Sequence, residues 1–295
     1  MRKHFEISYC PLTISLIALQ RAELPPYLGS TLRGALGQAL LQTDKEACTF
    51  LYRNGEKKDR DMGNVVVKPY MIIPPEIQTP QTVFGQGEKL DFELLLFGNA
   101  EEYVSAVVSA LEQLYRFGLG VRRYKFDLSE IINSQTRRII WRKGQYFKEA
   151  VTGADIQRYE LQNVTGMVIK ICTPLRIRHG GRLVKQISFQ TLIRNITNRI
   201  MALTERYGGW TDQEEAGRLL ALAEKVRTVH EEIKVERMER YSNRTNAKMD
   251  FSGLIGTIEY EGDLTPFVPW VYAAQRLHIG RNTTFGMGKI QVYFI

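Results

Sequence analysis

FGLGVRRYKF (117–126) and FGMGKIQVYF (285–294) are two copies of one short pattern, and together they decide the fold of this 295-residue chain. The copies agree at the first Phe, at both glycines and at the final Phe, and Leu and Met are similar at the third place. Each copy follows an amphipathic helical pattern and leads into a strand pattern. Because the same context surrounds both copies, the sequence predicts a tandem duplication of one structural unit.

The elements around the first copy predict what that unit is. Two amphipathic patterns with helical spacing cover residues 30–41 and 100–116, and Gly118 fits the position just after a helix. Strand patterns cover residues 11–19, 65–73, 90–97 and 123–128. The order is therefore β-α-β-β-α-β, which is the ferredoxin-like unit that RNA-recognition modules share.

The second half repeats this order with one insertion. Strand patterns cover residues 167–175, 232–242, 252–260 and 289–295. Ser188 is expected to cap the first helix of this half, and Thr265 and Pro266 are expected to open the last one. A capping box over residues 211–214 predicts an inserted helix that runs to about Arg227.

The two halves together predict an α+β protein with two tandem ferredoxin-like (RRM-like) domains, each an antiparallel sheet with helices on one face. We place the domains at residues 1–150 and 151–295, because TGADIQRYELQNVTG (152–166) is polar and lacks clear periodicity. A glycine-rich loop, residues 280–288, belongs to the second domain.

Composition limits the classes of function. The chain has 40 Lys and Arg against 32 Asp and Glu, and this net charge of +8 fits a polyanion partner without proving one. Three distant cysteines (Cys10, Cys48 and Cys172) lack metal-binding spacing, so we expect no metal and no other cofactor. No apolar run reaches the ~18 residues of a membrane helix, and the N-terminal segment lacks a signal-peptide cleavage site. We therefore expect a cytoplasmic protein without a membrane partner.

The loop HIGRNTTFGMGK (278–289) is the first candidate site. Gly280, Gly286 and Gly288 permit positive φ and remove side chains, so backbone N–H groups could point at an anion, and Arg281 and Lys289 add charge. The loop is not a nucleotide-binding P-loop, because it follows a helix and contains no GK[ST]. A sharp helix-to-strand turn would need the same glycines for geometry alone. Both interpretations stay open at this point.

Several motifs resemble those of a known family. A helix, the loop GRNTTFGMG and a terminal strand resemble the signature of the RAMP superfamily of CRISPR-associated proteins. YLGSTLRGALGQAL (27–40) is similar to the first-helix motif of its pre-crRNA-processing endoribonuclease branch, TPLRIR (173–178) to the opening of that branch's C-terminal domain, and RYSNR (240–244) to its arginine-serine stretch. The similarity spans nearly the whole chain. It implies tandem ferredoxin-like domains that bind a CRISPR repeat RNA, the precursor crRNA, in antiviral defence.

The resemblance also implies a reaction. A ribose 2′-OH would attack the adjacent phosphate without a metal, leaving a 2′,3′-cyclic phosphate and a 5′-OH, with a base, an acid and a cation as catalysts. Tyr27 and Lys45 flank the first helix in positions similar to those of catalytic residues in relatives, and His179 lies in an arginine-rich turn. Many relatives carry a first-helix histidine where this chain has Gln38, which cannot act as a general base near neutral pH. The alternative is therefore a non-catalytic subunit that holds repeat or guide RNA in an effector complex.

Basic residues supply the predicted RNA contacts. A run of charge is more often a solvated face, but residues 237–248 combine arginine with an aromatic ring and amide donors. The candidate RNA-binding residues are Arg33, Arg122, Arg123, Lys125, Arg176, Arg178, Arg237, Arg240, Arg244, Lys248, Gly280, Arg281, Gly286, Gly288 and Lys289. Besides RNA, this interpretation allows other CRISPR effector subunits and a second copy in a homodimer as partners. A ferredoxin-like pair with no nucleic-acid role would explain the fold, but not the net charge and the arginine clusters together.

Overall fold

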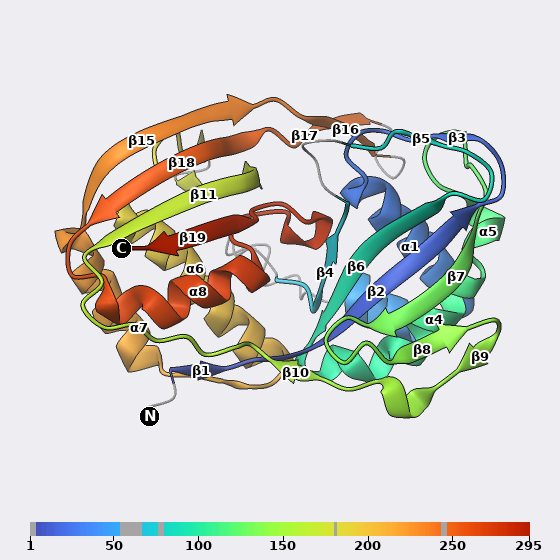
Figure 1. Cartoon of the computed structure of the whole chain (residues 1–295), viewed down its shortest axis with the longest axis horizontal. Helices are drawn as coiled ribbons and strands as arrows, with labels where there is room; N and C mark the ends of the chain where they lie inside the picture. The colour runs from blue at the N-terminus through green and yellow to red at the C-terminus, as the bar shows by residue number, and fades with distance from the viewer. Residues whose placement is uncertain (1–3, 54–66, 76–79, 180–181, 243–246) are drawn as a thin grey trace. The chain divides into compact units, whose positions relative to one another are not determined.

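The computed structural model divides the chain into two compact units (Figure 1). It describes residues 4–53, 67–75, 80–179, 182–242 and 247–295. The N-terminal unit is Ser8–Asp155, and the C-terminal unit combines Ile156–Ile295 with the short segment that ends at Ile7. The division thus falls after Asp155, where the sequence placed it after residue 150. Among the described residues, no helix has both the length and the apolar character needed to cross a membrane.

The N-terminal unit is built on a seven-stranded sheet with the path β4-β6-β2-β7-β8-β9 and with β10 paired to β2. Its four principal strands are β2 (Ser8–Ala18), β4 (Tyr70–Ile73), β6 (Lys89–Phe97) and β7 (Phe126–Asn133). The remaining strands are β8 (Ile139–Arg142), β9 (Gln145–Tyr146) and β10 (Ala154–Asp155). All pairs are antiparallel, and the second, third, first and fourth principal strands lie side by side, which is the ferredoxin-like arrangement.

Helices cover one face of this sheet (Figure 1). They are α1 (Gly29–Thr43), α2 (Lys45–Cys48), α4 (Val104–Glu112) and α5 (Leu114–Phe117), with a π-helical turn at Thr49–Arg53 and a 3-10 turn at Gly98–Tyr103. Alternation in β2 explains the layering, because Leu12, Ile14 and Leu16 are fully buried while Thr13 and Ser15 are partly exposed. The apolar stripes of α1 and α4 contribute to the same core.

Two details of this unit differ from the sequence prediction. The helix expected over residues 100–116 is a 3-10 turn followed by two short helices, which are interrupted at Gln113. The strand expected from residue 123 begins only at Phe126, because Arg123 has a φ of +53° and lies in a tight turn. Arg123 and Lys125 therefore do not share a strand face.

The C-terminal unit has the same arrangement in a four-stranded antiparallel sheet of order β15-β18-β11-β19. The strands are β11 (Gly166–Leu175), β15 (Arg227–Glu236), β18 (Gly253–Glu261) and β19 (Ile290–Phe294). The helices are α6 (Phe189–Tyr207), α7 (Gln213–Leu222) and α8 (Val268–Leu277). Both units are thus ferredoxin-like, and α7 is an insertion between the first helix and the second strand, so the predicted fold class is confirmed.

Element ends in this unit follow local hydrogen bonds. Ser188 caps α6 as predicted, since its side chain accepts a hydrogen bond from the Thr191 N–H. The cap of α7 is Asp212 rather than Thr211, because the Asp212 carboxylate accepts from the Glu215 N–H. Helix α7 ends at Leu222 and β15 already begins at Arg227, where the sequence predicted a helix end. The last helix opens with a 3-10 turn at Thr265–Phe267 whose N-cap is Leu264.

The strand predicted over residues 232–242 is in fact two strands. β15 ends at Glu236, and β16 (Glu239–Ser242) pairs with β17 (Ala247–Asp250) in a separate hairpin. We call β16 and β17 the basic hairpin, because residues 237–248 carry the arginine-rich sequence. This hairpin is inserted between β15 and β18 of the ferredoxin-like order.

The glycines of the two sequence copies, 117–126 and 285–294, adopt matching backbone conformations. Gly118 and Gly120 have φ of +71° and +73°, and their counterparts Gly286 and Gly288 have +84° and +73°. The copies differ around them, because α5 ends at Phe117, the first residue of the first copy, whereas α8 ends at Leu277, well before the second. The final Phe begins β7 in one copy and ends β19 in the other. The match at that Phe is therefore not a structural equivalence.

Gly288→Ala is expected to destabilise the protein. A Cβ at this position would lie 1.8 Å from the Ile279 carbonyl oxygen, at a φ of +73°. We expect the free energy of unfolding to fall by more than about 2 kcal/mol in urea titrations. Gly34→Ala is the matched control, because a Cβ there has nothing within 4 Å and alanine in an exposed helix stabilises by about 0.5–1 kcal/mol. Equal effects of the two substitutions would contradict the assignment of a close approach at Gly288.

Candidate nucleic-acid interface

The glycine loop, residues 278–289, is anchored to the end of β11. The Arg281 N–H donates to the Arg176 carbonyl at 2.8 Å. The Thr173 hydroxyl donates to the Gly286 carbonyl at 3.0 Å and accepts from the Lys289 N–H at 2.9 Å. These bonds fix the loop in one conformation along the strand end.

Packing accounts for two of the loop glycines. A Cβ at Gly280 would lie 2.7 Å from the Arg176 carbonyl oxygen, and one at Gly288 would meet Ile279. Gly286 and Gly288 are buried, and the Gly286 N–H donates to the Thr283 carbonyl. Close packing is therefore enough to explain the glycines at 280 and 288.

Arginine side chains crowd the loop. Arg281 is half-buried and Arg178, on β12 (Arg178–His179), is exposed. Burial lowers the pKa of Arg281, and the nearby charges of Arg178 and Arg176 lower it further. Three guanidinium groups that repel one another favour the binding of an anion, which would relieve the repulsion.

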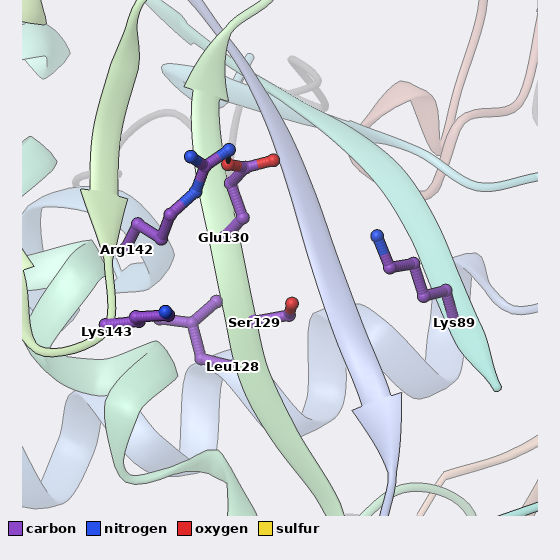
Figure 2. Close-up of a pocket in the computed structure, with 6 residues that line it drawn as sticks. All are labelled: Lys89, Leu128, Ser129, Glu130, Arg142 and Lys143. Carbon is purple, nitrogen blue, oxygen red and sulfur yellow. Dashed lines mark ion pairs between the residues drawn. The ribbon is translucent and has the colours of Figure 1, made fainter. Parts of the chain in front are cut away.

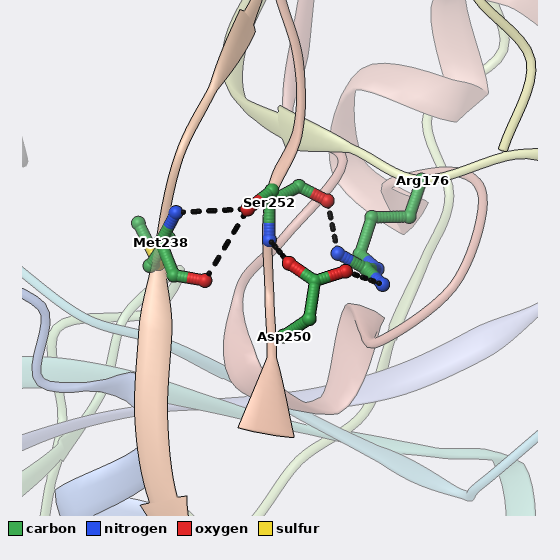
Figure 3. Close-up of polar contacts among 4 residues, drawn as sticks. All are labelled: Arg176, Met238, Asp250 and Ser252. Carbon is green, nitrogen blue, oxygen red and sulfur yellow. Dashed lines mark hydrogen bonds and ion pairs between the residues drawn. The ribbon is translucent and has the colours of Figure 1, made fainter. Parts of the chain in front are cut away.

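Arg176, also predicted to bind RNA, is held inside the protein. Its side chain is only 4% exposed, and its guanidinium donates to the Ser252 carbonyl and, at 3.1 Å, to the Asp250 carboxylate (Figure 3). Hydrogen bonds from Ser252, together with those from Arg176, lower the pKa of Asp250 to about 2. The guanidinium is thus committed to these partners, and the sequence prediction missed them because Ser252 lies 76 residues away.

The basic hairpin is described through its backbone. Arg240 lies on β16 and Lys248 on β17, and Arg237 is exposed just before β16. The side chains of His179, Arg240 and Lys248 lie outside the described residues, as does the whole of Arg244.

In the N-terminal unit, helix α1 separates two of the catalytic candidates. Tyr27 precedes the helix, and burial raises the pKa of its phenol, which therefore stays protonated. Lys45 is exposed at the start of α2, beyond the other end of α1. Fifteen helical residues span about 22 Å, so Tyr27 and Lys45 are not brought together. Gln38 lies between them on the exposed side of α1.

The other candidates of this unit have structural partners. The Arg33 guanidinium lies 4.9 Å from the centre of the Tyr52 ring, and the Tyr52 hydroxyl donates to the Arg33 carbonyl at 2.9 Å. Gly37 packs against the same ring, whereas Gly34 faces open space, so these two glycines do not form one close-approach surface. The Lys125 ammonium donates to the Arg116 carbonyl at 3.0 Å.

Arg122 and Arg123 are exposed in the turn before β7. A second basic feature of this unit is a shallow hollow of about 370 Å³ beside β7 and β8, lined by Lys89, Leu128, Ser129, Glu130, Arg142 and Lys143 (Figure 2). Glu130 forms an ion pair with Arg142 there, which offsets part of the positive charge. Within the described part of the chain, no three His, Cys, Asp or Glu side chains are grouped to hold a metal ion.

His278, directly before the loop, is a buried structural residue. Its Nδ1 lies 3.2 Å from the Met287 carbonyl oxygen, to which the neutral ring can donate. Burial, reinforced by the charges of Arg199 and Lys289, lowers the pKa of His278 to about 3. Arg199 is itself buried and donates to the Leu277 carbonyl at the end of α8 at 2.6 Å.

Acid is expected to destabilise the protein through His278. The unfolded ring titrates near ~6.5 and the folded ring near 3, so between these values the unfolded state binds the extra proton. Stability should therefore fall as the pH falls, with a contribution of about 1.4 kcal/mol per pH unit between roughly pH 6 and 4. In urea titrations across this range, His278→Asn should reduce the slope by that amount; an unchanged slope would contradict the assignment.

Two family models match the chain. Residues 7–155 match AF_1859_N, which is described as an N-terminal domain, and residues 169–290 match the CRISPR-associated endoribonuclease Cas6. A relative from Archaeoglobus fulgidus (strain ATCC 49558 / DSM 4304 / JCM 9628 / NBRC 100126 / VC-16), described as an uncharacterized protein, is 22% identical over 205 residues, which are 63% of this chain and 65% of the relative.

Solved structures share the fold over the whole chain. A Thermus thermophilus Cas6 has a TM-score of 0.58 at 11% identity, covering 99% of this chain and all of its own. A Cas6 product complex has a TM-score of 0.56 at 14% identity, covering 96% and 99%. A partial Cas6-RT-Cas1–Cas2 complex has a TM-score of 0.64 at 13% identity, and this chain spans 47% of that longer chain. The chain belongs to the family of the AF_1859_N model, which matches half of it, and residues 169–290 of its second unit are similar to the CRISPR-associated endoribonuclease Cas6.

Proposed function

We propose that this protein binds CRISPR repeat RNA and cleaves precursor crRNA as a metal-independent endoribonuclease. The observation that carries RNA binding is the crowding of Arg178 and Arg281 beside the glycine loop, inside the region matched by the Cas6 family model. Arginine binds phosphate through two parallel hydrogen bonds and stacks on exposed bases. A cluster held in place by backbone hydrogen bonds is ready to receive a phosphate without reorganising.

The proposed reaction forms a bond between the ribose 2′-oxygen and phosphorus while the bond from phosphorus to the 5′-oxygen breaks. The 2′-OH loses its proton, and the leaving 5′-oxygen gains one. Tyr27 suits the second role, because its phenol is protonated and can donate to the leaving oxygen. With Tyr27 in that role, Lys45 acts elsewhere on the RNA, since α1 separates the two. Gln38 can hold the 2′-OH by a hydrogen bond but cannot take its proton.

A specific observation favours a second candidate function, that of a non-catalytic RNA-binding subunit. Gln38 occupies the exposed side of α1 where the sequence resemblance places a histidine in many relatives. A protein with this site would hold repeat or guide RNA for other CRISPR subunits, as a single chain or as a homodimer. Both candidates share the same RNA surface and differ only in chemistry.

Cleavage separates the two candidates. The protein is incubated in EDTA with a labelled repeat transcript, and in parallel with one whose nucleotide 5′ of the cut is 2′-deoxy. The enzyme should cut only the first RNA and leave a 2′,3′-cyclic phosphate, because the 2′-oxygen is the nucleophile. Tight binding with both RNAs intact would establish the non-catalytic subunit, and no binding at moderate salt would remove both candidates.

Gln38→His is expected to accelerate cleavage. The position is exposed, so a histidine fits without repacking, and it would supply the general base that α1 lacks. General acid–base catalysis contributes about 10²–10⁴-fold, and we expect single-turnover rates to rise toward that range. Gln42→His, also exposed but one turn further along α1, is the matched control and should leave the rate unchanged. Equal rates for wild type and Gln38→His would place the reacting phosphate away from this helix.

A further inference from the structure

We propose that the base of the basic hairpin, residues 237–238 and 250–252, and the glycine loop act as one RNA-contacting unit, in which Arg176 is the positioning residue that joins them and not an RNA ligand. This inference rests on the proposed RNA binding and deepens it. It assigns Arg176 a different role from its arginine neighbours Arg178 and Arg281.

The first link is polar and passes through Arg176. Its side chain reaches the end of β17, donating to the Asp250 carboxylate and to the Ser252 carbonyl just after the strand (Figure 3). Its own carbonyl accepts the hydrogen bond from the Arg281 N–H of the glycine loop. One residue therefore holds the hairpin with its side chain and the loop with its backbone.

Ser252 extends this link to the other strand of the hairpin. Its hydroxyl accepts from the Met238 N–H at 3.1 Å, and Met238 directly precedes β16. Its own N–H donates to the second oxygen of Asp250 at 2.9 Å. Both stems of the hairpin are thus tied to the Arg176 guanidinium through short hydrogen bonds.

The second link is apolar and independent of charge. The Phe251 and Phe285 rings meet edge to face, with centroids 5.0 Å apart and planes at 87°, and both side chains are buried. Phe251 follows β17, and Phe285 ends the 3-10 turn Thr283–Phe285 of the glycine loop. The hairpin base and the loop are therefore packed together as well as hydrogen-bonded.

A positioning role explains why a charged pair is used here. Burying a guanidinium costs much of the attraction that its ion pair supplies, so an apolar side chain of similar volume would stabilise the fold about as well. The Arg176 fork instead fixes two hydrogen-bond acceptors in one plane. The base of the hairpin, next to the exposed Arg237, is then held at a fixed position relative to the Arg281 backbone.

Double-mutant cycles test whether Arg176 couples the hairpin base to the glycine loop. Repeat-RNA affinity is measured for Arg237→Ala, Arg281→Ala and the double variant, first in the wild type and then in an Asp250→Asn background. Arg237 represents the hairpin and Arg281 the loop. In the wild type, the Kd of the double variant should differ by about threefold or more from the value expected if the two single effects multiplied. In the Asp250→Asn background, this coupling should weaken, because Arg176 loses its charged partner while the contact between Phe251 and Phe285 remains.

Asp263→Asn is the matched control, because Asp263 is an exposed carboxylate of the same unit, and it should leave the coupling intact. Coupling that is unchanged in Asp250→Asn, or that is absent from the wild type, would overturn the proposal. Melting curves of each variant establish that all are folded at the assay temperature. A change in coupling then reflects the link through Arg176 and not unfolding.

Amide hydrogen exchange tests the joint without RNA. Asp250→Asn, a change on the hairpin side, should accelerate exchange of the Arg281 N–H on the loop by about tenfold, whereas Asp263→Asn should not. Unchanged Arg281 exchange in Asp250→Asn overturns the joint. If Asp250→Asn accelerates exchange of the Arg281 N–H but the wild type binds no repeat RNA, the proposed function fails, while the link between hairpin and loop through Arg176 stands.

Discussion

The carbonyl of Ile279 approaches Gly288 so closely that no side chain fits between them, and the conformation of the glycine loop depends on this contact. The Ile279 N–H donates to the Gly288 carbonyl at 3.0 Å and closes the loop at its base. Ile279 lies two residues after the end of α8 and Gly288 two residues before the start of β19, so closure brings these two ends together. It buries His278 beneath the loop and leaves Arg281 beside the end of β11.

The basic side chains around the glycine loop differ in how deeply they are buried. Arg199 and His278 lie in the interior, where desolvation lowers both of their pKa values, the first to about 10 and the second to about 3. Arg176 is also buried, but it keeps its partners Asp250 and Ser252. Arg178 and Arg281, by contrast, lie beside the glycine loop and keep positive charge toward solvent. The protein thus separates arginines that build the site from arginines that can meet a ligand.

In the N-terminal unit, the catalytic candidates Tyr27 and Lys45 lie beyond opposite ends of one helix, α1. A helix of fixed rise places Tyr27, Gln38 and Lys45 at set distances, and no side-chain rotation brings its two ends together. Any chemistry on this helix is therefore limited to groups near one point. A protonated Tyr27 before the helix and an exposed Gln38 on it are hydrogen-bond donors at two separate points.

The sequence by itself determined the two ferredoxin-like units, the Ser188 cap and the positive φ of the paired glycines. These features follow from periodicity and from backbone sterics, which act within a few residues. It could not separate the roles of Arg176, Arg178 and Arg281, because their difference depends on Asp250 and Ser252, which lie more than 70 residues from Arg176. Nor could it divide the strand predicted over 232–242 into β15 and a separate hairpin, since the break follows from pairing with distant strands. The tertiary structure decided which cations are exposed, because burial is set by neighbours in space rather than by neighbours in the chain.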